Sequence, residues 1–142
     1  MKTTNRALSL LLAILMFFSL TACFKHKVDV TGLWEQATYT KDTTLGSGSK
    51  SITVQVTAGD KSITFTLKTD KETLEDVMKE NSLVEGDESQ YGLYIKKVNG
   101  ILADYDVDAT YWGINADGEA TATGASGVIV QEGVVYEFIR KQ

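Results

Sequence analysis

The stretch "SITVQVTAGDKSITFTLKTDKETLEDVMKEN", residues 51–81, contains two strand patterns followed directly by a helix pattern. Apolar and polar residues alternate on both sides of the turn "AGDK", which is typical of a β-hairpin with one buried face. In the helix pattern, which we expect to span Thr69–Asn81, one apolar stripe is formed by Leu74, Val77 and Met78. The stretch therefore predicts a hairpin and an amphipathic helix that packs on the buried face of a sheet.

The residues after the helix continue with strand patterns. The runs "GLYIKKV" and "ILADYDV" flank Asn99-Gly100, and Asn-Gly is typical of a two-residue type I′ turn because both positions tolerate a positive φ. A further strand pair is expected from "SGVIV" and "VVYEFIRK" near the end of the chain. This order of elements predicts an α+β fold of the β-grasp (ubiquitin-like) class, in which one helix crosses one face of a mixed sheet.

The first 22 residues have the pattern of a secretory signal. A short basic head with Lys2 and Arg6 precedes the apolar run Ala7–Phe18, which is too short for a transmembrane helix. The run ends in "LTAC", which resembles the lipobox of bacterial lipoproteins and implies that Cys23 carries the lipid. We therefore expect a signal peptide over residues 1–22 and a chain anchored through Cys23 to the outer face of a bacterial membrane.

The expected domain organisation continues with a lipidated, flexible tether over residues 23–50 and a folded domain over residues 51–142. The tether prediction depends on the composition of "LGSGSK" at residues 45–50. Trp34 is unusual in a spacer. It is expected either to dock on the domain or to form part of a binding surface.

Composition and motifs argue against several functions. The formal net charge is −5 without a basic cluster, so nucleic acid is a poor candidate partner. The only histidine, His26, and the only cysteine, Cys23, both lie in the expected tether, and no motif of a catalytic nucleophile is present, so we do not expect an enzyme. A calcium loop that begins at Asp104 would need glycine and glutamate where the chain has Ala109 and Asn115. We therefore expect no metal site, and expect "ADYDVDA" to be a strand with a solvated acidic face.

The stretch "YGLYIKKVNGILADYDVDATYW", with "DGE" and the final "EGVVYEF", resembles the transcobalamin-like C-terminal domain family, which includes bacterial DUF4430-type lipoproteins. The resemblance implies a small binding domain with cobalamin as a possible ligand and no required cofactor. The animal carriers of this family also have a large helical domain, and we expect none in these 142 residues. We therefore expect this chain either to bind a large cofactor weakly or to need a second binding domain or a transporter component to complete the site.

The expected ligand-binding residues are Tyr105, Tyr111, Trp112 and Asn115. Adjacent residues of an extended segment point to opposite faces, so Tyr111 and Trp112 cannot both enter one core. Trp112 is expected on the ligand side, because an exposed indole combines an apolar face with one N–H donor. The alternative is that Trp112 fills the core and Tyr111 is a surface residue. Two functions remain open. The first is a cell-surface module that binds a cobamide-like molecule for an importer, and the alternative is a structural or adhesion-type protein-interaction module.

Overall fold

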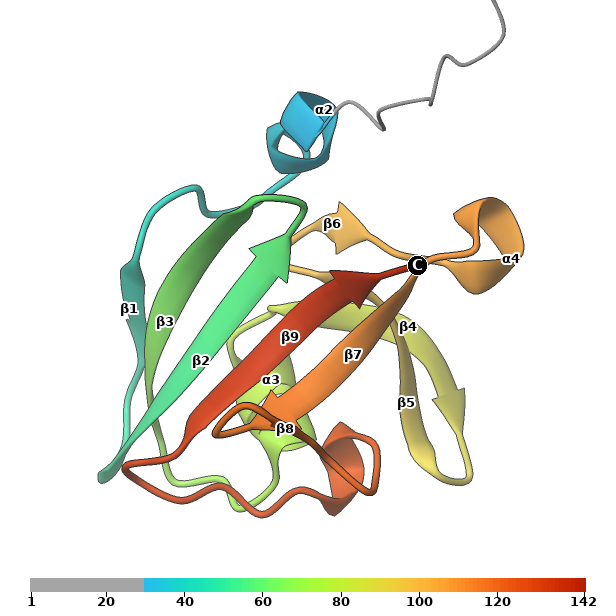
Figure 1. Ribbon diagram of the computed structural model, residues 1–142. Coiled ribbons are helices and arrows are strands. Elements are labelled where there is room, and N and C mark those ends of the chain that lie inside the picture. Colours follow the sequence, from blue (N-terminus) through green and yellow to red (C-terminus); the bar gives the residue numbers. More distant parts are fainter. Residues whose placement is uncertain (1–29) are drawn as a thin grey trace, which may run out of the picture.

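The computed structural model describes residues 30–142, which form an α+β fold made mostly of strands (Figure 1). The larger sheet is mixed and six-stranded, in the order β1-β3-β2-β9-β7-β8, with β1 parallel to β3 and β2 parallel to β9. Its strands are β1 (Thr43–Gly46), β2 (Lys50–Ala58), β3 (Lys61–Thr69), β7 (Tyr111–Ala116), β8 (Glu119–Ala120) and β9 (Val135–Lys141). A second sheet contains β4 (Val84–Ser89), β5 (Gly92–Val98) and β6 (Ile101–Leu102).

The hairpin expected at the start of the domain is confirmed. Strands β2 and β3 pair antiparallel over their whole length, and their inward residues, among them Val54 and Phe65, are fully buried. Helix α3 (Leu74–Glu80) packs its apolar stripe into the same core, behind the sheet in Figure 1. The helix begins later than the expected Thr69, because Thr69 still belongs to β3 and the Thr73 hydroxyl caps the helix by accepting the Asp76 N–H at 3.2 Å.

The Asn99-Gly100 turn is also confirmed, with φ values of 53° and 79°. Asn99 also makes long-range hydrogen bonds that its position in the turn does not predict. Its buried side-chain amide accepts the Tyr39 N–H at 2.9 Å and donates to the Tyr39 carbonyl at 2.8 Å. The turn therefore also holds the segment that precedes β1.

The strand expected at "ADYDVDA" is wrong. Strand β6 ends at Leu102, and the one-turn helix α4 (Tyr105–Asp108) follows. The Asp104 side chain caps this helix by accepting the Asp106 N–H at 3.1 Å, and Ala109 ends it in the left-handed conformation. A local side-chain cap offers the backbone an alternative to the strand ladder, which explains why the alternating pattern failed here.

The flexible tether expected over residues 23–50 is wrong for its described part. Residues 30–50 contain helix α2 (Val30–Glu35) and strand β1, and β2 already begins at Lys50. Trp34 belongs to the core, where its indole N–H donates to the Ala58 carbonyl at 3.0 Å and the Lys61 ammonium lies 4.7 Å from its ring. The folded part therefore starts about twenty residues earlier than the composition suggests.

The last part of the chain has one strand where two were expected. The "SGVIV" stretch begins in the short 3-10 helix η1 (Ala125–Gly127), and it contributes only one isolated bridge, between Ile129 and Thr73. Strand β9 enters the middle of the large sheet, between β2 and β7.

The signal peptide, Cys23 and His26 lie outside the described residues. Within residues 30–142, no helix has the length and apolar character needed to cross a membrane.

Candidate functional site

Two adjoining hollows lie along one side of β7. The polar hollow, of about 350 Å³, is lined by Tyr111, Trp112, Gly113, Ile114, Asn115, Ala120, Thr121, Thr123, Gly124 and Lys141. The apolar hollow, of about 190 Å³, lies between β7, β5 and η1 and is lined by Leu93, Tyr94, Ile95, Tyr111, Trp112, Ile114, Gly124 and Ala125. Because four residues of β7 and its neighbouring loop line both hollows, the two form one candidate site.

The hollows exist because one edge of β7 is only partly paired. Strand β9 pairs with the whole of β7, whereas β8 pairs only with Asn115 and Ala116. The Ile114 carbonyl accepts the Thr121 N–H at 3.0 Å on the side away from β9. Alternate residues of an antiparallel strand direct their backbone groups to the same edge, so the N–H and C=O of Trp112 also face away from β9. Within residues 30–142, no backbone hydrogen bond joins these two groups to β5.

The structure reverses the orientation predicted for the Tyr-Trp pair. Trp112 is 8% exposed and belongs to the core, whereas Tyr111 is 42% exposed. The register explains this result, because Trp112 and Ile114 lie on the same face of β7 and Ile114 pairs with the buried Phe138 of β9. Both members of the pair still line both hollows, Tyr111 from the outer side and Trp112 from the core side.

The indole N–H of Trp112 is a buried donor without a hydrogen-bond partner in the described part of the chain. Such groups are rare in folded proteins, since leaving one unpaired costs roughly 1–3 kcal/mol. The other tryptophan, Trp34, shows the usual situation, in which the indole N–H donates to a backbone carbonyl.

The other two predicted ligand-binding residues, Asn115 and Tyr105, lie in different places. Asn115 lines the polar hollow, and its amide nitrogen lies 3.4 Å from a carboxylate oxygen of Glu137. Tyr105 is 61% exposed on α4 and lines neither hollow. The structure therefore brings Tyr111, Trp112 and Asn115 together and leaves Tyr105 apart.

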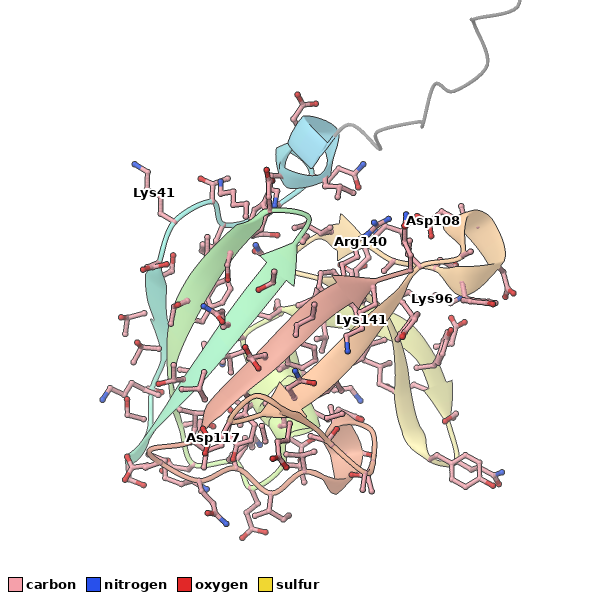
Figure 2. All side chains as sticks on the ribbon, in the orientation of Figure 1. Lys41, Lys96, Asp108, Asp117, Arg140 and Lys141 are labelled. Atoms are coloured by element: carbon pink, nitrogen blue, oxygen red, sulfur yellow. The ribbon has the colours of Figure 1, made fainter. Side chains whose placement is uncertain are left out.

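Two of the three aspartates around α4, Asp104 and Asp108, make structural contacts, and Figure 2 shows Asp108 beside Arg140. Asp108 accepts from Arg140 at 2.7 Å and from both the backbone and the hydroxyl group of Thr110. Burial alone would raise the pKa of Asp108, but the hydrogen bonds from Thr110 and the charge of Arg140 outweigh it and lower the pKa below its ordinary value. Asp104 lies 3.4 Å from the Lys96 ammonium. Among the described residues, no three histidine, cysteine or acidic side chains gather where they could hold a metal ion.

The wall formed by β5 is held by a buried carboxylate. Glu75 of α3 is 7% exposed, accepts the Leu93 N–H at 3.0 Å and pairs with Lys79 at 2.8 Å. Gly92 makes this approach possible, because a Cβ there would lie 2.7 Å from the Glu75 carboxylate. The sequence reasoning missed the whole of this wall, including Tyr94, which is 51% exposed beside the apolar hollow.

The geometry is consistent with what comparison with known proteins finds. A family model described as "Domain of unknown function (DUF4430)" matches residues 71–138. A solved structure described as "a putative metal binding protein from Ruminococcus gnavus ATCC 29149" is 35% identical with a TM-score of 0.62, over 66% of this chain and 98% of that one. The chain belongs to the DUF4430 family. The DUF4430 match includes β5, β7 and the loop between β8 and η1, and thus most of the candidate site.

The fold is also similar to that of part of haptocorrin. Haptocorrin, solved in complex with Cbi, matches 69% of this chain with a TM-score of 0.51 and 20% identity, and the match covers 27% of haptocorrin. At this identity the similarity shows a shared fold, which confirms the resemblance found in the sequence. No curated protein matches the chain.

Proposed function

We propose that this DUF4430 chain is a small-ligand-binding module and that its ligand occupies the polar and apolar hollows beside β7. The observation that carries the proposal is the composition of the site. Exposed tyrosines from two strands, Tyr94 and Tyr111, frame hollows whose walls are otherwise mostly apolar or uncharged. A concave site with aromatic walls and few polar groups is the usual form of a small-molecule pocket.

The same lining favours binding over catalysis. Neither hollow is lined by a carboxylate, a thiol or an imidazole, and the one charged group is the ammonium of Lys141. General acid–base chemistry needs a proton donor or acceptor with a pKa near the working pH. The metal binding ascribed to the Ruminococcus gnavus protein is not extended to this chain, because residues 30–142 gather no suitable ligand set.

Cobalamin or a related cobamide is our candidate ligand. The support is the fold shared with haptocorrin, together with the order of β2, β3, α3, β7 and β9, which we assign to the β-grasp class. A corrin is larger than either hollow, so this module would contact one side of it and a second domain or a transporter component would cover the other. Trp112 lines both hollows, and a ligand acceptor that reached its buried, unpaired indole N–H would satisfy that donor.

We further propose that the module is anchored through lipid on Cys23 at the outer face of a bacterial membrane and delivers its ligand to an importer. This part depends on the signal and lipobox pattern of the first 23 residues.

The binding proposal is tested by calorimetric titration of the full-length protein with cyanocobalamin and with cobinamide. Tyr111→Ala and Trp112→Phe should each weaken binding at least about fivefold, because one removes an outer wall and the other the unpaired donor. Tyr105→Ala is the matched control and should bind like the wild type. Corrin binding that is unaffected by Tyr111→Ala and Trp112→Phe would place the ligand elsewhere, and no binding of either corrin would remove this ligand class.

A protein-interaction module is the second candidate, and the open edge of β7 is the observation that favours it. An extended peptide could pair with the free N–H and C=O of Trp112, as peptides do when they add a strand to a sheet edge. The open segment covers only the first part of β7, so few hydrogen bonds are available. An interaction partner whose binding survives Tyr111→Ala but is lost when this edge is blocked would favour this function.

A further inference from the structure

We infer that the ligand of the candidate site carries an anionic group, a carboxylate or a phosphate, which binds Lys141 in the polar hollow while the apolar part of the same ligand occupies the apolar hollow. This inference rests on the proposed function, because it names the ligand class of that site.

The position of Lys141 is the first observation. It is the penultimate residue of the chain, and its side chain runs over β7 on the face of the sheet opposite α3 (Figure 2). A Cβ on Gly113 would lie 2.8 Å from the Lys141 Cε and 3.1 Å from its Nζ. The aliphatic part of the Lys141 side chain therefore packs on the backbone of Gly113. Both residues line the polar hollow, so the ammonium lies at its wall.

The charge balance around Lys141 is the second observation. In the described part of the chain, Lys79, Lys96 and Lys97 each pair with at least one carboxylate, and no carboxylate lies within ion-pair distance of Lys141. The neighbouring cation Arg140 lies on the opposite face of β9 and is already engaged by Asp108 and the Leu102 carbonyl. Of the two cations at this end of β9, Arg140 is paired and Lys141, within residues 30–142, is not, so Lys141 remains available to a ligand.

The surroundings also indicate where in the hollow the anion would lie. Glu137 reaches the Asn115 amide at 3.4 Å and places a negative charge near that end of the polar hollow. Like charges repel, so an anionic group is favoured at the other end, where Tyr111 and Lys141 are paired across β7 and β9. The apolar hollow adjoins this end through Tyr111 and Trp112. The arrangement therefore suits an amphipathic ligand with an aromatic or alicyclic body and one anionic substituent.

The test compares two probes that differ in charge. 8-Anilinonaphthalene-1-sulfonate and N-phenyl-1-naphthylamine share the same aromatic body, and only the first carries an anionic group. Each is titrated by fluorescence into the full-length protein, and the binding that Tyr111→Ala removes is assigned to the site. Lys141→Met keeps a long apolar stem but removes the charge, and Lys68→Met is the matched control, since Lys68 is an exposed lysine on β3 that also lacks a carboxylate partner among the described residues.

We expect Lys141→Met to weaken the sulfonate probe about fivefold and the neutral probe less than about twofold, as for a partly exposed ion pair. Lys141→Arg should restore most of the loss, and Lys68→Met should change neither probe. If both probes bind at the site and Lys141→Met affects neither, or both equally, the anion inference fails while the binding module stands. If neither probe depends on Tyr111, the proposed site itself fails for aromatic ligands.

Discussion

Replacement of Asn99 by alanine should destabilise the fold strongly, because Asn99 combines a positive φ with two buried long-range hydrogen bonds. Asn99 is fully buried, and its amide satisfies both backbone groups of Tyr39, sixty residues away in the sequence. Each backbone group left unpaired costs roughly 1–3 kcal/mol, and water at the half-buried Tyr39 reduces that loss toward the lower end. Alanine at a φ of 53° adds roughly 1–2 kcal/mol of backbone strain. The expected decrease in the free energy of unfolding is therefore about 3–4 kcal/mol.

Two further variants separate these contributions in urea unfolding followed by fluorescence. Asn99→Gly loses the same hydrogen bonds but tolerates the positive φ, so it should cost about 2 kcal/mol. Asn115→Ala is the control, because its amide makes one contact at 3.4 Å, and it should stay within about 0.5 kcal/mol of the wild type. An Asn99→Ala protein as stable as this control would refute the reasoning. Equal stabilities of Asn99→Ala and Asn99→Gly would show that the turn carries no strain.

The remaining predictions concern the site, the anchor and the response to pH. Trp112→Ala should lower the free energy of unfolding by about 3–5 kcal/mol and Tyr111→Ala by less than about 1 kcal/mol, and equal losses in thermal melts would contradict their opposite burial. Cys23→Ala should abolish incorporation of labelled fatty acid, and labelling at the wild-type level would remove the lipoprotein proposal. The pKa of Asp108 is lowered in the folded state, so its contribution to stability is present above the ordinary carboxyl pKa of about 3.9 and is lost as the pH falls below it. The wild type should therefore exceed Asp108→Asn in stability at pH 6 and approach it in strong acid, and a difference that does not change with pH would contradict this assignment.

Elements whose cause is local could be predicted from the sequence. The β2–β3 hairpin follows from two alternating runs across a glycine turn, and the positive φ values follow from the residue types of Asn99-Gly100. The apolar stripe of α3 likewise identified the helix, although its start was placed at Thr69, the last residue of β3, and residues 70–73 connect the two elements. In each case the conformation is determined by residues that are close together in the sequence.

Elements whose cause is tertiary could not be predicted. The "ADYDVDA" stretch alternates like a strand, but the ion pair between Asp108 and the distant Arg140 favours a helical turn, to which Asp104 adds a local cap. Trp34 lies in a polar segment, and only the Ala58 carbonyl at the end of the distant hairpin explains its burial. The candidate site likewise depends on tertiary contacts, because Tyr94 and Lys141 reach it from β5 and β9. No spacing in the sequence predicts that either strand lies beside the edge of β7.

The docking of Trp34 limits how far the folded part can travel from an anchor on Cys23. A spacer that ran to residue 50 could extend to roughly 90 Å, since each extended residue spans at most about 3.5 Å. Six residues, 24–29, separate Cys23 from the start of α2 at Val30, and six residues span at most about 20 Å. A module lipidated at Cys23 would therefore stay close to the bilayer surface. Its encounter with a membrane-embedded partner would then take place by diffusion in the plane of the membrane.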